Sequence, residues 1–217
     1  MSIGNYPKIM TISRHRMGSD GEGVSTLVTF WGCPLRCKYC INDFCHDENY
    51  KCIRISPEKL YERLRVDDIY YRMSGGGIVF GGGEPLLQSE YIVETVKLFP
   101  NAWKVRIETS LNVDWRQIEP LIPFVDQWII DIKDMNPAIY KRYTGLSNEK
   151  VVENLEYLSQ RVTHSRIFLR VPNILGYNTA EDVKRSIKNV EKYGYIDFFN
   201  YRVIRTKAKK CTLENEI

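Results

Sequence analysis

The stretch Cys33-Pro-Leu-Arg-Cys37-Lys-Tyr-Cys40 places three cysteines within eight residues, directly after the apolar run Ser25–Gly32. Three thiolates can bind three irons of a [4Fe–4S] cube and leave the fourth iron open. An open iron can take a substrate or a cofactor, whereas a cluster with four cysteine ligands usually transfers electrons. The CxxxCxxC spacing therefore predicts a cluster held by Cys33, Cys37 and Cys40.

Zinc is the alternative occupant of these thiolates. Cys45, His46 and Cys52 follow closely and carry the donor atoms that zinc prefers. Structural zinc sites often pair two CxxC elements, and here only Cys37 and Cys40 form one. The spacing favours the iron–sulfur cluster, and an electron-carrying or zinc-binding module stays the non-enzymatic alternative.

The composition is that of a globular protein: 43% of the 217 residues are hydrophobic and 27% are charged. A net charge of +4, from 31 basic and 27 acidic residues, gives no reason to expect a nucleic-acid partner. No segment approaches the roughly 20 apolar residues of a membrane helix, and the N-terminus lacks a secretion signal. We expect a cytoplasmic monomer that binds no membrane and keeps its six cysteines reduced.

Short runs rich in β-branched and aromatic residues alternate with longer amphipathic stretches. The runs predict six strands, at Ser25–Trp31, Gly77–Phe80, Trp103–Ile107, Gln127–Asp131, Arg166–Val171 and Ile196–Tyr201. The longer stretches predict helices at Pro57–Arg72, Gln88–Leu98, Asn148–Arg161 and Ala180–Tyr193, with a short one at Trp115–Leu121.

This alternation is typical of α/β proteins whose parallel strands are joined by helical crossovers. Six units are too few for an ordinary eight-unit barrel. We therefore expect a single domain over residues 1–217 that forms a partial, open (β/α)6 TIM-like barrel. A doubly wound sheet is the alternative.

Polar or glycine-rich residues stand at the carboxyl end of every predicted strand. In chain order these are Cys33, Gly81–Glu84, Glu108 with Thr109, Asp131 with Lys133, Arg170, and Asn200–Arg202. Active sites of parallel α/β folds lie at this edge of the sheet. Independent placement of six such groups at one edge predicts a single large site.

The second of these groups, Gly81-Gly-Gly-Glu84, has two interpretations. A tight turn that needs a positive φ accounts for the glycines alone. Glycines also let backbone carbonyls approach a ligand, and a carboxylate beside them can accept hydrogen bonds from an ammonium group. After a CxxxCxxC segment, ligand capture is favoured. Glu108-Thr109 and Asp131-Ile-Lys133 can equally be strand-end caps or surface ion pairs.

These motifs resemble those of the radical S-adenosylmethionine (SAM) enzymes, in which an aromatic residue such as Tyr39 precedes the third cysteine. Within that family, the chain resembles the activating enzymes of glycyl-radical enzymes along most of its length. The segments that carry the resemblance are Asp20–Val24, Gly32–Asn42, Ile78–Gln88, Asp131–Pro137, Tyr143–Asn148 and Arg170–Asn178.

The resemblance implies that Cys33, Cys37 and Cys40 hold a [4Fe–4S] cluster whose open iron binds SAM. It also implies a set of SAM-binding residues on neighbouring strand ends: Tyr39, Gly81, Gly82, Gly83, Glu84, Glu108, Thr109, Lys133 and Arg170. A flavodoxin or ferredoxin would supply one electron, and the 5′-deoxyadenosyl radical from SAM would remove a hydrogen atom from the substrate. In the resembled enzymes, that substrate is a glycine of a partner protein.

Other substrates stay open. Many of these activating enzymes insert a region with two further clusters, which needs about eight more cysteines, whereas only Cys45 and Cys52 lie in that interval here. Where the family often has Tyr-His on the last strand, this chain has Tyr201-Arg202. A maturase of a ribosomally made peptide and a small-molecule enzyme similar to deazapurine synthases are the alternatives. We expect Cys45, Cys52 and Cys211 to be inert thiols.

Overall fold

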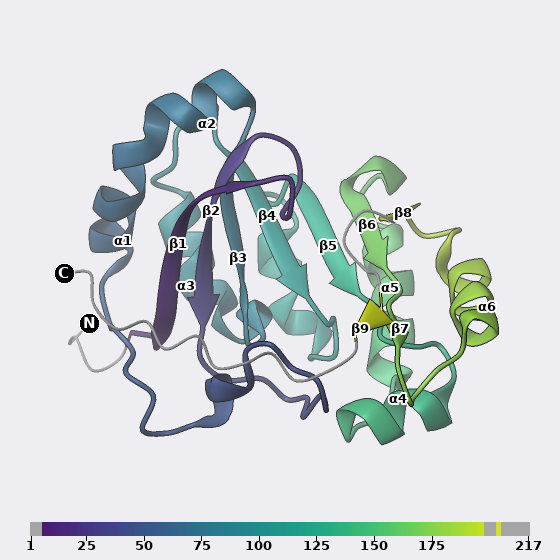
Figure 1. Cartoon of the computed structure of the whole chain (residues 1–217). Coiled ribbons are helices and arrows are strands. Elements are labelled where there is room, and N and C mark those ends of the chain that lie inside the picture. Colours follow the sequence, from purple (N-terminus) through teal and green to yellow (C-terminus); the bar gives the residue numbers. More distant parts are fainter. Residues whose placement is uncertain (1–5, 198–202, 205–217) are drawn as a thin grey trace.

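The computed structural model describes residues 6–197 and the two-residue strand β9 (Val203–Ile204). Seven strands form one sheet in the order β1-β2-β3-β4-β5-β6-β8 (Figure 1). All neighbouring pairs from β2 to β8 are parallel, and these strands are β2 (Val24–Phe30), β3 (Gly77–Gly82), β4 (Lys104–Thr109), β5 (Gln127–Asp131), β6 (Ile167–Arg170) and β8 (Tyr195–Ile196). Parallel strands in chain order confirm the predicted open α/β barrel.

The six parallel strands agree closely with their predicted positions. The last of them begins one residue earlier than expected, at Tyr195. Asp197 follows outside the strand, and residues 198–201 of the predicted strand, the polar group Asn200–Arg202 and Cys211 lie outside the described residues. A separate parallel pair joins β7 (Asn173–Ile174) to β9.

The sequence interpretation missed one strand, β1 (Ile9–Met17), which runs antiparallel to β2. Three consecutive charged or polar residues, Arg14 to Arg16, interrupt its apolar alternation, and the register shifts between Ser13 and Arg16. Such a bulge hides a strand from a period-two pattern. Pairing with β2, which the sequence alone does not reveal, makes this segment a strand.

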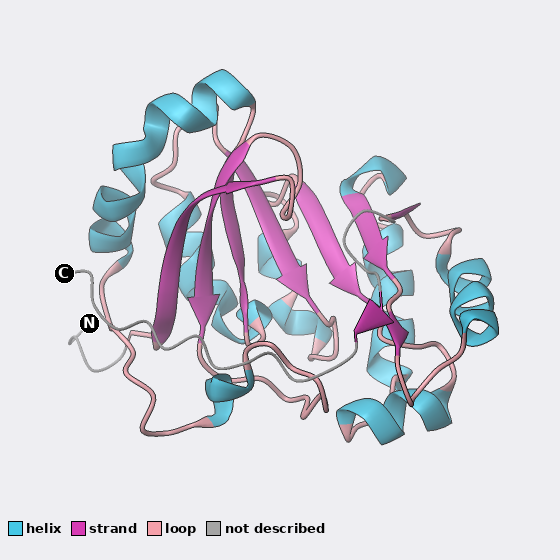
Figure 2. Cartoon of the chain, viewed as in Figure 1, coloured by secondary structure: helices cyan, strands magenta, loops and turns pink. Residues whose placement is uncertain are grey.

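The helices occupy the connections between the parallel strands (Figure 2). Three predicted helices are present in shorter form, as α3 (Ser89–Val96), α5 (Glu149–Ser159) and α6 (Ala180–Val190). The predicted helix Pro57–Arg72 is divided into α1 (Pro57–Leu64), the 3-10 turn η3 (Arg65–Asp67) and α2 (Asp68–Ser74). The division falls where Asp67 is fully buried and binds Arg14 of β1 through two hydrogen bonds of 2.7 and 2.6 Å.

The remaining helical turns are short. The predicted helix Trp115–Leu121 consists of the 3-10 turns η5 (Trp115–Gln117) and η6 (Glu119–Leu121). Further 3-10 turns are η2 (Asp43–His46), η4 (Pro85–Gln88) and η7 (His164–Arg166). None of the helices in the described ranges combines the length and apolarity needed to cross a membrane.

One complete helix was not predicted, α4 (Pro137–Thr144). Its local signals are nonetheless regular: Asn136 accepts hydrogen bonds from the backbone of Ala138 and Ile139, and Gly145 follows in the left-handed conformation at φ 90°. Asparagine at the N-cap, proline in the first turn and glycine after the last turn are common helix boundaries. The last residues of α4 accept backbone hydrogen bonds from the cysteine segment and so support it.

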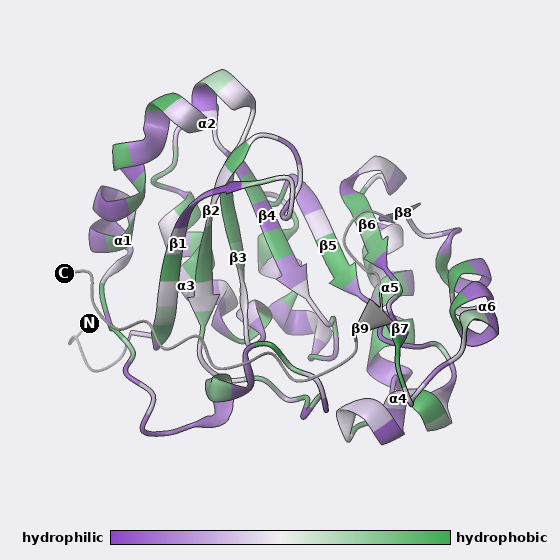
Figure 3. Cartoon of the chain, in the orientation of Figure 1, coloured by the Kyte–Doolittle hydropathy of each residue, from purple (hydrophilic) through white to green (hydrophobic). Residues whose placement is uncertain are grey.

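Side chains alternate between the two faces of the curved sheet, as the strand period requires. One set is buried among the helices and forms the core: Val28, Phe30, Ile78, Phe80, Val105, Ile107, Trp128, Ile130, Ile167 and Leu169. Hydrophobic colouring accordingly concentrates on the strands (Figure 3). The alternate positions on the concave face carry charges at Arg106, Glu108, Asp131 and Arg170. The sheet thus directs its charged side chains into the barrel interior.

The β1–β2 connection closes one end of this interior. Arg106 donates a hydrogen bond of 2.9 Å to the Glu22 carbonyl, and Arg170 donates one of 2.7 Å to the Ser19 carbonyl. Gly21 packs on the Arg106 guanidinium, because a Cβ there would lie 2.7 Å from its Nε. The loop therefore crosses the concave face and forms a floor beneath the opposite, carboxyl-terminal opening.

Candidate active site

A cavity of about 410 Å³ lies at the carboxyl ends of the parallel strands. Ten of the twelve residues predicted for the site line it: Cys33, Cys37, Tyr39, Cys40, Gly82, Gly83, Glu108, Thr109, Lys133 and Arg170. Gly81 and Glu84 are not part of its lining. The structure thus brings together residues from the ends of five strands, as the strand-end pattern predicts.

The cysteine segment is fixed by backbone hydrogen bonds on both sides. The Glu84 N–H donates to the Gly32 carbonyl at 2.8 Å, which joins the segment to the glycine motif. On its other side, Arg36 and Lys38 donate from their backbones to the carbonyls of Thr144 and Tyr143, at 2.7 and 3.1 Å. The end of α4 thereby holds the loop that carries the three thiols.

The three thiols are half-buried. Burial raises the pKa of Cys33, and the nearby Glu84 carboxylate raises it further. Burial also raises the pKa of Cys37 and of Cys40. Iron binds thiolates, so the positive charge of bound iron would offset this burial cost.

The donor set fits an iron–sulfur cube better than zinc. Cys33, Cys37 and Cys40 line one cavity, yet no three His, Cys, Asp or Glu side chains in the described part of the chain gather closely enough to hold a single metal ion. Zinc needs its ligands within about 2.3 Å of one centre. In a cube each thiolate binds a different iron, so the ligands lie farther apart.

Close packing accounts for the last glycine of β3 and the glycine that follows it. Gly82 has φ 102°, a region that favours glycine, and a Cβ there would lie 2.6 Å from the Thr29 Cβ. A Cβ on Gly83 would lie 2.1 Å from the Gly32 carbonyl oxygen. The Asn42 side-chain amide donates to the Gly82 carbonyl at 3.0 Å. The glycines therefore let the loop after β3 lie directly against the cysteine segment.

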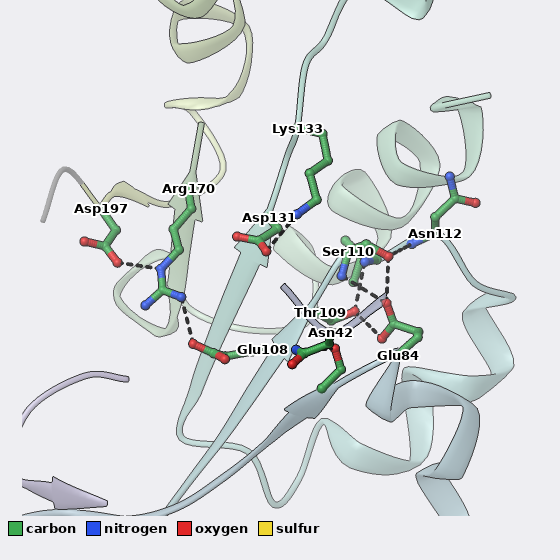
Figure 4. A network of polar contacts seen from close by, with 12 residues as sticks. Asn42, Glu84, Glu108, Thr109, Ser110, Asn112, Asp131, Lys133, Arg170 and Asp197 are labelled. Carbon is green, nitrogen blue, oxygen red and sulfur yellow. Dashed lines mark hydrogen bonds and ion pairs between the residues drawn. The ribbon is translucent and has the colours of Figure 1, made fainter. Parts of the chain in front are cut away.

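Glu84 lies behind the cavity wall. It is fully buried, and its carboxylate accepts from the Thr109 hydroxyl at 2.6 Å, from the Ser110 hydroxyl and N–H at 2.7 and 3.0 Å, and from the Leu86 N–H at 3.3 Å (Figure 4). Burial raises its pKa, while these donors favour the ionised form. In this arrangement Glu84 fastens the end of β3 to the end of β4, and a direct contact with SAM stays a prediction.

Arg170 joins three separate elements at the base of the cavity. Its guanidinium donates to Glu108 of β4 at 2.7 Å and to Asp197 after β8 at 2.8 Å (Figure 4). It also donates to the Ser19 carbonyl. Burial raises the pKa of Glu108, although the Arg170 charge acts in the opposite direction. The predicted SAM-binding arginine is therefore pre-positioned by one acid on β4 and one just after β8.

Asp131 and Lys133 form an ion pair of 2.9 Å on the cavity wall (Figure 4). Lys133 has φ 61°, a left-handed conformation that costs a non-glycine residue about 1–3 kcal/mol. The intervening Ile132 N–H donates to the Arg170 carbonyl at 2.9 Å and so fixes the turn. The pair is thus a built part of the site and more than a surface contact.

Several lining residues were not predicted from the sequence. Arg16 reaches the cavity from the end of β1, Ser19 and Asp20 reach it from the β1–β2 floor, and Ser110 and Cys45 also line it. Burial favours a higher pKa for Asp20, but hydrogen bonds from Arg16 and Ser19 hold it below its usual value. The Asp20-Gly-Glu-Gly segment was the available signal, but only the tertiary contacts of the loop place it in the site.

Tyr39 lies at the rim within a group of three tyrosines. Its ring meets those of Tyr143 and Tyr177 edge-on, with centroids 6.3 and 5.6 Å apart. Tyr143 and Tyr177 also contact each other at 5.1 Å. These contacts tie the cysteine segment to α4 and to the loop between β7 and α6, so Tyr39 has a packing role beside its predicted one.

The sequence profile of the Radical SAM superfamily matches residues 27–190, well over half of the chain, and the chain belongs to this superfamily. Membership implies a [4Fe–4S] cluster and SAM as cofactors. The solved structure of coproporphyrinogen III oxidase from Escherichia coli, itself a radical SAM enzyme, shares the fold with a TM-score of 0.56 at 15% identity, over 92% of this chain and 52% of that one.

More particularly, the chain is a homologue of the activating enzymes of glycyl-radical enzymes. The (2S)-3-sulfopropanediol dehydratase activating enzyme of Klebsiella oxytoca is 30% identical over 73% of this chain and 69% of the relative. The choline trimethylamine-lyase activating enzyme of Oleidesulfovibrio alaskensis is 26% identical over 90% of this chain and 81% of the relative.

Proposed function

We propose that this chain activates a glycyl-radical enzyme by removing a hydrogen atom from a glycine of that partner. The observation that carries the proposal is the single cavity shared by Cys33, Cys37, Cys40 and the glycine motif, in a homologue of such activating enzymes. When bound, a reduced [4Fe–4S] cluster supplies the electron that cleaves SAM to the 5′-deoxyadenosyl radical.

The three thiols would hold this cluster, because they lie on one loop that is fixed to both the glycine motif and α4. Gly82 and Gly83 expose backbone where an ammonium group needs acceptors. Lys133 and Arg170 offer cationic donors to the carboxylate or ribose of SAM. Glu84, Thr109 and Ser110 hold this wall in place, and the β1–β2 floor excludes water from below.

The Arg170→Lys variant should bind SAM about 10–100-fold more weakly. A lysine keeps the charge but loses the planar fork that donates to Glu108, Asp197 and Ser19 together. Equilibrium binding of SAM to the reconstituted protein measures the change. The matched control is Arg166→Lys. Arg166 directly precedes the amino end of β6, away from the cavity, and donates hydrogen bonds to the carbonyls of Ile122 and Val125. Equal effects of the two substitutions would exclude a specific role for Arg170.

The proposed function is tested with anaerobically reconstituted protein, SAM and a chemical reductant. Formation of 5′-deoxyadenosine and methionine tests the radical SAM step by itself. Capture of partners from the native host with SAM present, followed by an electron paramagnetic resonance search for a glycyl radical, tests the substrate. A captured precursor peptide would indicate a maturase, and turnover without any protein partner would indicate a small-molecule enzyme.

A further inference from the structure

Four basic side chains surround the outer face of the cysteine segment: Arg36, Lys38, Lys141 and Arg142, here called the basic rim. All four are exposed. Arg36 and Lys38 flank Cys37, which is part of the cavity lining. Arg36 and Lys38 are exposed whereas Cys37 lines the cavity, so the two cations lie outside the thiol that they flank.

The two halves of the basic rim adjoin in space. The hydrogen bonds from Arg36 and Lys38 to Thr144 and Tyr143 place the cysteine segment along the last turn of α4, which contains Lys141 and Arg142. A Cβ on Gly145, directly after α4, would lie 3.9 Å from the Arg36 Cβ. The four charges therefore belong to one surface.

The charge of this surface is only partly offset by its surroundings. Arg36, Lys38 and Lys141 form no ion pair with any residue that the structure describes. Arg142 donates to the Tyr177 carbonyl and lies 5.4 Å from its ring centroid, so it keeps its charge. Of the acids that act on the thiols of the cysteine segment, Asp131 is paired with Lys133 on the cavity wall, and the exposed acid beside the segment is Asp43. Four cations outweigh it.

We propose that the basic rim is the docking surface for an acidic one-electron carrier protein of the flavodoxin type. The inference rests on the proposed radical SAM function, which requires one electron for each SAM cleaved. The reduced carrier loses that electron, and the oxidised cluster gains it. A cationic surface steers an acidic partner and fixes its orientation. Here it does so one residue from Cys37, which keeps the path for the electron short.

The test compares a double charge reversal, Lys38→Glu with Lys141→Glu, against a control that makes the same charge change on α6, Lys184→Glu with Lys188→Glu. Affinity for a bacterial flavodoxin is measured first, as a function of salt. The rim variant should bind about tenfold or more weakly at low salt and lose most of its salt dependence. The α6 variant should match the wild type.

SAM cleavage then separates docking from chemistry. With reduced flavodoxin as the donor, the rim variant should be about tenfold slower, in proportion to its lost affinity. With 5-deazariboflavin that is photoreduced by Tris as the sacrificial electron donor, a small mediator that needs no docking surface, its rate should equal that of the wild type. Equal flavodoxin affinity and rate in all three proteins would overturn the docking proposal. The proposal would also be overturned if the rim variant bound its protein substrate more weakly but bound flavodoxin like the wild type. That result would assign the basic rim to the protein substrate. Failure of the wild type to cleave SAM with 5-deazariboflavin would instead contradict the proposed function. The flavodoxin affinities of the three proteins would then decide by themselves whether the basic rim is the docking surface.

Discussion

The Cys37→Ala variant should lose SAM cleavage to background, a fall of more than about 100-fold, because even the loss of a partner beyond the ligands costs up to that factor. Cys37 lines the cavity and is the second of the three cysteines along the chain. Its loop is fixed by backbone hydrogen bonds to Tyr143 and Thr144. Removing Cys37 leaves two ligands for a cube that needs three. Iron content and 5′-deoxyadenosine formation measure the two losses.

The matched control is Cys52→Ala. Cys52 is a free thiol that does not belong to the cavity lining, so its removal should preserve both iron content and cleavage. Retained turnover in Cys37→Ala would refute the assignment of the ligands. Equal losses in both variants would show that cysteine removal damages the protein in general.

The Glu84→Ala variant should unfold more easily, by about 3 kcal/mol or more, and should bind SAM weakly as a consequence. The substitution leaves the hydroxyls of Thr109 and Ser110 and the Ser110 N–H without their acceptor inside the protein. Each buried group left unpaired costs about 1–3 kcal/mol. Denaturant unfolding of the purified protein under anaerobic conditions measures the change.

Two further variants serve as controls for the stability of Glu84→Ala. Glu90 is an exposed glutamate in the first turn of α3, so Glu90→Ala should change stability by less than about 0.5 kcal/mol. Glu84→Gln keeps the shape and one acceptor oxygen, so it should lose less stability than Glu84→Ala. If Glu84→Ala unfolds like the wild type yet loses SAM affinity, the carboxylate contacts SAM and does not primarily hold the wall.

The sequence predicted the parallel part of the fold because each strand there is a short buried run followed by a helix signal. The sequence pattern did not predict β1, because its bulge and the charges of Arg14–Arg16 break the alternation that identifies a strand. The sequence pattern did not predict α4 either, although Asn136 and Gly145 mark its two ends. The helix has only eight residues, and polar and apolar side chains are mixed along it. Both elements matter to the site, one through the floor loop and the other through the cysteine segment.

The composition of the site followed from strand ends, but the individual roles did not. Glu108 and Arg170 were predicted separately, and their contact across β5 arises from the register of β4, β5 and β6. Glu84 was predicted to bind SAM, and this stays a prediction; the sequence did not reveal the donors at Thr109 and Ser110 that hold its carboxylate. Hydrogen-bond partners that are distant in sequence decide the direction of a buried carboxylate, and no local pattern contains them.

The sequence by itself determined the chemistry: the spacing of Cys33, Cys37 and Cys40 and the glycines after the next strand are local, covalently set features. It also determined the edge at which they meet, because parallel strands carry their ends to one side. Only the tertiary structure decided which residues enclose the cavity, that Asp20 of the floor reaches it, and that the end of α4 lies along the cysteine segment. The physical reason is that these contacts depend on long-range packing and hydrogen bonding, which a chain acquires only when its distant segments come together.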